Sequence, residues 1–195
     1  VSIKLQFFRL WIAEELIANG KTDICMIGRP NLCDSEFANK AYAGKAEDIR
    51  PCIGCGRCLN GIMFGKPISC TVNPSVETNA IEKATEKKKV LVIGGGPAGM
   101  EAAYVAKKRG HEVVLCEKSN ELGGLLRIAA VPISKQELCK VIKFMARRLQ
   151  NEGIEVRMNC EVTPEMLETE FKDYEVVCSI GAKPKEIESF KQFKQ

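Results

Sequence analysis

The chain has 195 residues, 45% of them hydrophobic, and its 29 Lys and Arg against 25 Asp and Glu give a formal net charge of +4. This length supports one ordinary hydrophobic core, or one core with a small appendage, and the interleaved charges exclude the basic face that nucleic acid requires. No apolar run approaches the length of a membrane span, and the apolar N-terminal stretch contains Arg9 and no small-residue cleavage site, so we expect a globular cytoplasmic protein.

Residues 1–50 are typical of part of an α/β unit. The segment "IAEELIANG" predicts a helix that stops at Gly20, and "DICMIG" predicts a short buried strand. The segment "SEFANKAYAG" predicts a second helix, ending at Gly44. A strand between two helices indicates a βα fragment.

Residues 51–86 are rich in Gly and Pro and contain four clustered cysteines, Cys52, Cys55, Cys58 and Cys70. Such a segment has little apolar periodicity and needs something other than its own core to order it. The CxxCxxC run suits three irons of a [4Fe-4S] cluster, with Cys70 reaching the fourth. Zinc is the first alternative, although its usual sites come as two separated CxxC pairs. Disulfides or plain core cysteines are the second.

The glycines and the remaining cysteines fit this interpretation. Gly54 and Gly56 allow the backbone to curl around a cluster and to direct N–H groups at its sulfurs. In a cytosolic chain, ten cysteines indicate metal or redox chemistry more often than disulfides. Six of them lie in apolar surroundings and are expected to be small core residues: Cys25, Cys33, Cys116, Cys139, Cys160 and Cys178.

Residues 87–195 alternate strands and helices, which predicts a parallel sheet with helices on its faces. Gly94, Gly96 and Gly99 follow the strand "VLVI" and open a helix, the context of a dinucleotide-binding loop. Glu117 ends the second strand, where a carboxylate accepts both hydroxyls of an adenosine ribose. A 2′-phosphate would be repelled there, so the site suits FAD, ADP or NAD better than NADP. A purely structural strand-turn-helix is the alternative.

Two later helices have sequence signals at their starts. Ser134 and Glu137 form a potential capping box, followed by one apolar stripe made of Leu138, Val141, Ile142, Met145 and Leu149. Thr163 followed by Pro164 predicts the start of the next helix.

The order of these motifs resembles the iron-sulfur flavoenzymes related to old yellow enzyme. It runs from "DICMIGRP" through "DIRPCIGCGRC" and "CTVNP" to "VLVIGGGPAGMEAA" and "LGGLL". The family includes 2,4-dienoyl-CoA reductase, the clostridial enoate and bile-acid-pathway NADH:flavin oxidoreductases, and trimethylamine dehydrogenase. The resemblance covers roughly residues 12–184, and the joint cysteine and glycine spacing is more specific than either motif alone.

The resemblance implies a three-part α/β architecture. Residues 1–50 would be the C-terminal remnant of a TIM barrel that carries FMN and a small-molecule enoyl substrate. Residues 51–86 would hold [4Fe-4S] on the four clustered cysteines, and residues 87–195 would form an incomplete Rossmann-like domain for FAD or ADP. Electrons would pass from NAD(P)H through FAD and the cluster to FMN, and then to the enoyl double bond.

The same resemblance implies individual binding residues. Gly28 and Arg29 match the FMN-phosphate loop, although Arg29 is also explained as a loop arginine in an ion pair. Val162 would lie near the adenine and Gly181 near the pyrophosphate. The rest of the FAD or ADP site would be lined by Gly94, Gly96, Ala98, Gly99, Glu117, Lys118, Gly124 and Leu125.

The sequence departs from the family at its N-terminus. The stretch "VSIKLQFFRLW" matches neither the seventh barrel strand nor its phosphate loop. Seven barrel strands and the pyridine-nucleotide subdomain are expected to be missing. His111 is expected to be a solvated turn residue, so we predict no catalytic residue. We expect an internal fragment of an enzyme subunit, inactive alone, and the oligomeric state of its parent stays open.

A second functional hypothesis is an electron-transfer module, with a cluster and ADP or FAD, that serves a separate catalytic partner. Flavoproteins like the small subunit of glutamate synthase share the glycine and "LGG" motifs. The "IGRP" segment and the placement of CxxCxxC argue against that group.

Overall fold

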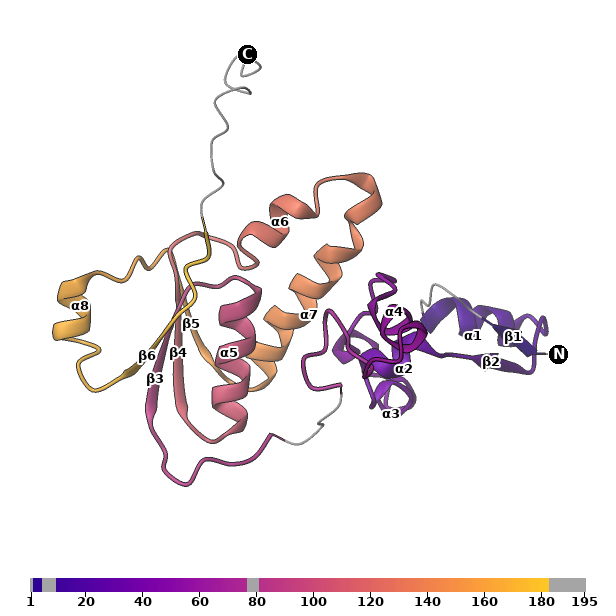
Figure 1. The fold of residues 1–195 in the computed structure, drawn as a ribbon, viewed down its shortest axis with the longest axis horizontal. Helices are drawn as coiled ribbons and strands as arrows, with labels where there is room; N and C mark the ends of the chain where they lie inside the picture. Colours follow the sequence, from indigo (N-terminus) through magenta and orange to yellow (C-terminus); the bar gives the residue numbers. More distant parts are fainter. Residues whose placement is uncertain (1, 5–9, 77–80, 183–195) are drawn as a thin grey trace, which may run out of the picture.

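The computed structural model describes residues 2–4, 10–76 and 81–182 (Figure 1). Residues 5–9 of the apolar N-terminal stretch and residues 183–195 of the predicted nucleotide-binding domain lie outside the described residues.

The N-terminal unit is a two-stranded parallel sheet with one crossover helix. β1 (Ser2–Lys4) pairs with β2 (Ile24–Met26), and α1 (Leu10–Ala18) connects them. Two expectations are wrong here. The sequence predicted one strand in this unit, whereas the structure has two, β1 and β2. The strand β2 was predicted to be buried, but its Ile24 is 63% exposed. A sheet of two strands covered by one helix leaves its other face open. This unit is consistent with a barrel fragment, but the barrel assignment stays a prediction.

Short helices connect this unit to the cysteine segment. They are α2 (Arg29–Cys33), α3 (Phe37–Tyr42) and η1 (Ala46–Asp48). Beyond them, α4 (Arg57–Met63) is a helix that the glycine-rich composition did not predict. It begins inside the CxxCxxC run, after Gly56 in the left-handed conformation at φ +75°.

The C-terminal domain is a four-stranded parallel sheet in the order β5-β4-β3-β6. Its strands are β3 (Lys89–Ile93), β4 (Glu112–Glu117), β5 (Glu155–Met158) and β6 (Glu175–Cys178). The helices are α5 (Pro97–Lys108), α6 (Leu125–Ala129), α7 (Glu137–Asn151) and α8 (Pro164–Glu168), with the short turn η2 (Ile133–Lys135) before α7. The predicted parallel α/β sheet is confirmed.

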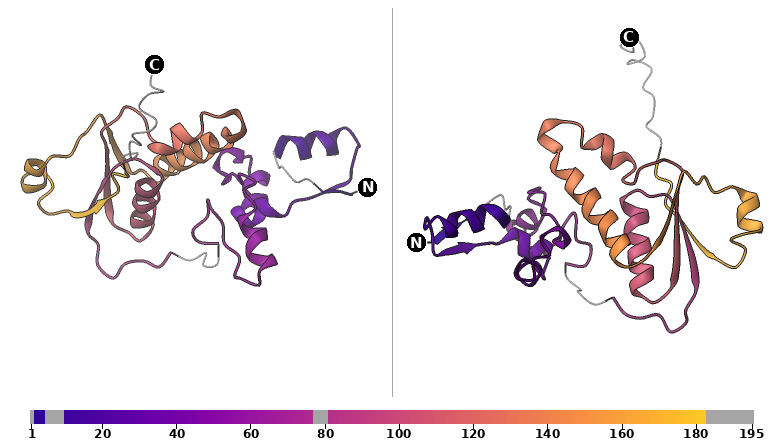
Figure 2. Two further views of the ribbon diagram at one scale, coloured as in Figure 1. Left: turned by 45° about the horizontal axis from the view of Figure 1, so that its top comes forward. Right: turned by 180° about the vertical axis from the view of Figure 1, so that it is seen from behind.

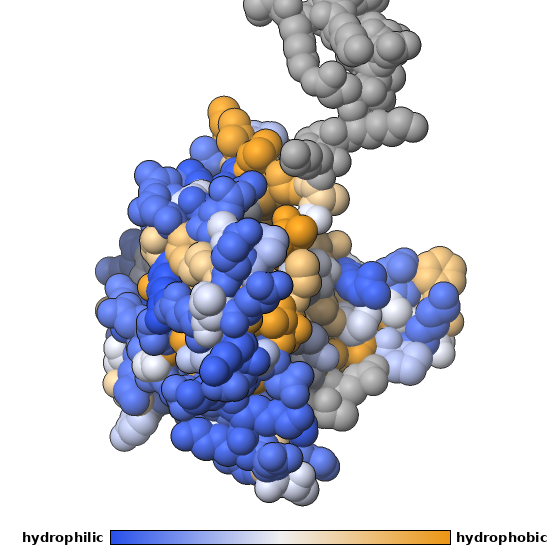
Figure 3. Space-filling view, turned by 90° about the vertical axis from the view of Figure 1, so that its left-hand side faces the viewer, coloured by the Kyte–Doolittle hydropathy of each residue, from blue (hydrophilic) through white to orange (hydrophobic). Residues whose placement is uncertain are grey.

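Alternate residues of the central strands supply two cores. On one face, Val92 and Leu115 pack with Met100 of α5 and with Leu149 of α7. On the other face, the second core consists of Leu91, Val114, Cys116 and Phe171, with side chains from the α8 region packed against it. Figures 1 and 2 show α5 and α7 on one side of the sheet and α8 on the other. The edge strand β6 is exposed along its length. Figure 3 shows apolar patches on an otherwise hydrophilic surface.

The predicted starts of the two later helices have different outcomes. Thr163 caps α8, because its Oγ1 accepts a hydrogen bond from the backbone N–H of Met166. The prediction of a capping box formed by Ser134 and Glu137 is wrong. Ser134 lies in η2, and α7 starts after Gln136 with no side-chain cap. The intervening 3₁₀ turn places Ser134 too early to act as an N-cap.

The scattered cysteines do not all lie in the core. Cys33 and Cys116 are buried, as predicted, whereas Cys25 and Cys160 are only partly buried. Cys139 and Cys178 are exposed, so their prediction is wrong. The described residues contain no helix that is long and apolar enough to cross a membrane.

The cysteine segment packs against the C-terminal domain. Ile53 and Val72 pack on the core cluster that contains α5 and α7. Just before the segment, Asp48 of η1 accepts hydrogen bonds from Arg147 Nε at 2.6 Å and from Asn151 Nδ2 at 2.9 Å, both on α7. The sheet domain therefore supplies the packing that residues 51–76 lack by themselves.

Candidate functional site

The loop between β3 and α5 has the geometry of a nucleotide-binding turn. Gly94 has φ +106°, and a Cβ there would lie 2.5 Å from the carbonyl oxygen of Ser179. A Cβ on Gly99 would overlap the carbonyl oxygen of Gly94. Gly96 is different, because a Cβ there meets nothing within 4 Å. Gly94 and Gly99 are thus needed for packing, and Gly96 opens space at the N-terminus of α5, which favours phosphate binding.

Glu117, at the end of β4, supports this loop. The residue is 8% exposed, and its Oε2 accepts a hydrogen bond from Gly95 N at 2.6 Å. Oε1 accepts from the backbone N and from Oγ of Ser119, each at 2.8 Å. Burial acts to raise the pKa of Glu117, but these hydrogen bonds outweigh it and hold the pKa below its usual value. The carboxylate therefore stays ionised next to the predicted ribose position.

The "LGG" loop lies against the glycine loop. Gly123 N donates a hydrogen bond to Gly95 O at 2.8 Å. A Cβ on Gly124 would lie 3.3 Å from the Cα of Gly96, and Leu125, which starts α6, is 50% exposed beside it. The structure thus brings together two predicted segments that lie far apart in the sequence.

The remaining predicted nucleotide residues lie on segments that end at the same edge of the sheet. Lys118 directly follows Glu117 and is exposed. Val162 follows β5 and packs on the second core, beside Cys116. Gly181 lies just beyond β6 with φ +72°, and Ala98 lies in the first turn of α5. These positions follow the carboxyl ends of parallel strands, where ligands bind open α/β sheets.

The four clustered cysteines line one pocket. Its wall consists of Cys52, Cys55, Cys58 and Cys70 together with Arg29, Leu32, Ile53, Gly56, Arg57, Thr71 and Val72. No three His, Cys, Asp or Glu side chains among the described residues converge in metal-binding geometry. The four thiols fit a [4Fe-4S] cluster in donor type and number, and Gly54 and Gly56 have the left-handed backbone that the predicted turn around it needs.

Arg29, which was predicted to contact an FMN phosphate, lies at this thiol pocket. It contributes to the pocket wall, and its positive charge acts to lower the pKa of Cys52, although burial is the larger effect and raises that pKa. Gly28 precedes it as the residue before α2. Their predicted contact with an FMN phosphate stays a prediction.

A fifth thiol, which the sequence predicted only as a small core residue, interacts with this set. Cys33, at the end of α2, is 1% exposed. Its interaction with Cys70 is the main reason why the pKa of Cys33 is raised and why the pKa of Cys70 is lowered to about 6. The sequence gave no sign of this interaction, because α2 and Cys70 are far apart along the chain.

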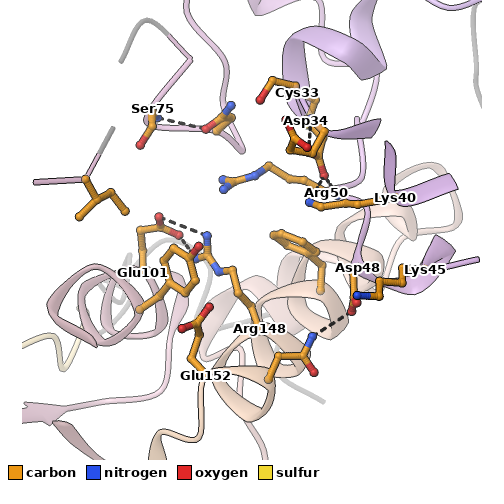
Figure 4. Close-up of a pocket in the computed structure, with 17 residues that line it drawn as sticks. Cys33, Asp34, Lys40, Lys45, Asp48, Arg50, Ser75, Glu101, Arg148 and Glu152 are labelled. Carbon is orange, nitrogen blue, oxygen red and sulfur yellow. Dashed lines mark hydrogen bonds and ion pairs between the residues drawn. The ribbon is translucent and has the colours of Figure 1, made fainter. Parts of the chain in front are cut away.

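A second cavity of about 560 Å³ lies between the cysteine segment and helices α5 and α7 (Figure 4). Arg50 points into it, and its Nη1 donates a hydrogen bond to Val72 O at 2.6 Å. Arg148 forms an ion pair with Glu101, and its guanidinium lies 3.7 Å from the centroid of the Tyr104 ring.

His111 lies in the turn between α5 and β4, as expected, and is partly exposed. Its Nδ1 accepts a hydrogen bond from Lys88 N at 3.1 Å, just before β3. It therefore belongs to the turn that leads into the sheet.

Comparison with known proteins identifies relatives of the chain. Residues 89–180 match the family model described as FAD dependent oxidoreductase. A cinnamate reductase from Clostridium sporogenes is 37% identical over 178 residues, which are 89% of this chain and 27% of that protein. The chain thus spans about a quarter of the length of such curated relatives.

Solved structures agree with this assignment. A 2-naphthoyl-CoA reductase bound to 2-naphthoyl-CoA superposes with a TM-score of 0.90 at 30% identity, covering 96% of this chain and 29% of that one. A histamine dehydrogenase from Rhizobium sp. 4-9 gives a TM-score of 0.85 at 26% identity, covering 95% and 28%. The resemblance predicted from the cysteine and glycine spacing is confirmed: the chain is a homologue of these reductases and amine dehydrogenases, and its residues 89–180 match the FAD-dependent oxidoreductase model.

Proposed function

We propose that this chain is the electron-relay part of an NAD(P)H-dependent flavin and iron-sulfur oxidoreductase. In the parent protein, electrons pass from NAD(P)H through FAD and [4Fe-4S] to FMN and reduce an enoyl double bond. One observation carries this proposal. A pocket lined by four thiols and a nucleotide-type glycine loop occur in one chain, and the thiol segment packs through Ile53 and Val72 on the core beneath that loop.

The chain's own residues support a nucleotide at the glycine loop. The space at Gly96 admits a pyrophosphate close to the first N–H groups of α5. Glu117 is ionised and can exchange its bond to Gly95 for a ribose hydroxyl. Leu125 offers an exposed apolar surface beside the loop. When bound, FAD supplies the exchange between two-electron and one-electron chemistry.

The thiol pocket supports the one-electron step. Its four thiols are acceptable ligands for [4Fe-4S], which supplies one-electron transfer when bound. Leu32, Ile53 and Val72 provide an apolar part of the wall that limits water, and Arg29 and Arg57 provide positive charge. Such a wall offsets part of the negative charge that a cluster with four thiolates carries.

The reaction of the parent is proposed to be reduction of an activated alkene, because the similar proteins include a cinnamate reductase and a 2-naphthoyl-CoA reductase. The likeness to a histamine dehydrogenase favours a second candidate, in which the same module transfers electrons for an amine dehydrogenase. FMN and the substrate would be bound outside residues 51–182, so we expect the chain alone to be inactive.

Two measurements test the proposed function. Anaerobically reconstituted protein should contain about four iron and four sulfide per chain and should bind FAD or ADP. Glu117→Arg, measured at a temperature where circular dichroism shows it folded, should weaken nucleotide binding by about 1–3 kcal/mol. Stoichiometric zinc without sulfide, or equal nucleotide affinity in both proteins, would contradict the corresponding half of the proposal.

A further inference from the structure

The cavity of about 560 Å³ between the cysteine segment and helices α5 and α7 has no role in the proposed function. None of its lining residues belongs to the glycine loop or to the thiol pocket. Two arginines from different parts of the chain line it, Arg50 from the segment before the cysteines and Arg148 from α7 (Figure 4). Their guanidinium carbons lie 5.3 Å and 5.4 Å from the centroid of the Phe144 ring. Two positive charges therefore flank one ring in this cavity.

Arg50 has no carboxylate partner among the residues that the structure describes. Its Nη1 donates a hydrogen bond to the carbonyl oxygen of Val72, a neutral acceptor, at 2.6 Å. The side chain is partly buried. A guanidinium has five N–H donors, so most of those on Arg50 are left for water or for a ligand.

Arg148 adds a positive charge that is fixed in place. It is 8% exposed, and its Nη1 and Nη2 donate to the carboxylate of Glu101. Its guanidinium also stacks on Tyr104. Its Nε is buried without a hydrogen-bond partner among the described residues. Because buried polar atoms are nearly always satisfied, Glu101 alone does not meet the donor capacity of Arg148.

The carboxylates that line the cavity do not neutralise Arg50. Glu36 is exposed and accepts a hydrogen bond from Asn39 Nδ2. The other lining carboxylates form ion pairs with other cations: Asp34 with Lys40, Asp48 with Arg147, Glu101 with Arg148 and Glu152 with Lys108. An anion in the cavity would thus meet Arg50 without having to displace a carboxylate from it.

We propose that this cavity is a phosphate site, in which Arg50 binds the phosphate group of a small organic phosphate and the positive charge of Arg148 assists. Guanidinium groups bind phosphate oxygens through paired N–H bonds. A phosphate is favoured over a carboxylate, because its tetrahedral oxygens can accept from arginines that approach from two different elements.

The rest of the cavity indicates the kind of molecule that carries the phosphate. A volume of about 560 Å³ lies in the range of small-molecule sites and exceeds what a phosphate group needs. Polar side chains of Ser35, Asn73 and Ser75 also line the cavity. They suit a hydroxyl-bearing body such as that of glycerol phosphate or a sugar phosphate.

The experiment is a calorimetric titration of the chain with inorganic phosphate, at constant ionic strength and with ADP in excess to occupy the glycine loop. Wild type is compared with Arg50→Gln and Arg50→Lys. The control is Arg109→Gln, which removes the same charge from an exposed position at the C-terminal end of α5, away from the cavity. Circular dichroism checks that each variant is folded.

We expect saturable binding of phosphate to wild type at millimolar concentrations. Arg50→Gln should bind about tenfold more weakly, Arg50→Lys should lie between the two, and Arg109→Gln should equal wild type. Glycerol phosphate should bind more tightly than inorganic phosphate, and succinate more weakly. In wild type alone, phosphate should shift the side-chain N–H signals of Arg50 in ¹H–¹⁵N NMR spectra, a test that needs no variant to fold.

Several outcomes overturn the inference. Folded wild type that binds no phosphate has no such site. Equal phosphate affinity in wild type and Arg50→Gln, or binding that disappears when ADP is added, places the phosphate outside this cavity. Tighter binding of succinate than of glycerol phosphate makes the ligand a carboxylate. None of these results changes the iron, sulfide and nucleotide measurements, so the proposed function is tested separately.

Discussion

At the scale of single residues, the glycines of the loop after β3 have separable roles. Gly99→Ala should destabilise the fold by about 3 kcal/mol, because its Cβ would overlap a backbone carbonyl that cannot move aside. Gly96→Ala is the matched control, since φ there is −71° and nothing lies within 4 Å of the new Cβ. It should unfold like wild type but bind FAD or ADP more weakly by about 1–3 kcal/mol. Equal unfolding temperatures in the two variants would contradict this distinction.

Glu117 should make the stability of the fold depend on pH. Its pKa is lowered in the folded state, so the ionised carboxylate stabilises the protein above the unfolded-state pKa, and this contribution is lost as pH falls through the folded-state pKa. Glu117→Gln should destabilise the fold by about 1–3 kcal/mol near neutral pH, because an amide cannot accept from Gly95 and Ser119 together.

Thermal unfolding over a pH series checks this prediction. The difference between wild type and Glu117→Gln should shrink as pH falls from about 7 to about 3. Glu121→Gln is the control, since Glu121 is an exposed partner of Arg127 and should change stability by less than about 0.5 kcal/mol. A difference that stays constant with pH would show that ionisation of Glu117 is not involved.

Sequence reasoning found residues with local signals and missed those defined by tertiary contacts. Gly94, Gly99 and Glu117 follow from a strand, a turn and a helix close together in the chain, and the structure brings them together. The interaction of Cys33 with Cys70 was missed because Cys70 lies beyond α3 and α4 along the chain. The hydrogen bond from Gly95 N to Glu117 Oε2 was also missed. A sequence motif indicates the contact of Glu117 with a bound ribose, and it carries no information about the partner of Glu117 when no ligand is bound.

At the scale of elements, the two helix starts provide a matched pair. Thr163→Ala should destabilise the C-terminal domain by about 0.5–1 kcal/mol, because Oγ1 caps α8. Ser134→Ala should change stability by less than about 0.5 kcal/mol, because no side chain caps α7. Denaturant unfolding of both variants measures the difference. An equal loss in both would mean that the capping box of Ser134 forms in solution.

The elements predicted with success are those with strong periodicity. The apolar stripe of α7 predicted its buried face, of which Val141, Met145 and Leu149 are in the core. Helix α4 has no such stripe: Leu59, Ile62 and Met63 are exposed, and its buried residue is Gly61. Strand β1 was missed because three residues carry no period, and its pairing with β2 is a non-local contact.

At the scale of the whole molecule, the two sheets should differ in stability. The C-terminal sheet has cores on both faces, whereas the pair of β1 and β2 has one helix and exposed side chains at Ile24 and Met26. Amide hydrogen exchange should therefore be faster in β2 than in β3 and β4 by a factor on the order of 100 or more. Similar protection in both sheets would contradict this expectation.

The packing of Gly94 against Ser179 has a consequence for how the chain forms on the ribosome. β3 lies between β4, which follows it closely, and β6, which is the last strand among the described residues. The turn at Gly94 reaches its final packing only when Ser179 has been made, since the backbone of Ser179 lies directly against it and donates its N–H to Ile93 O at 2.8 Å. At ordinary rates of translation this interval is on the order of 10 s. A nascent chain should thus expose an unfinished nucleotide loop for seconds, and a ribosome stalled before Ser179 should display a chain that cannot retain FAD.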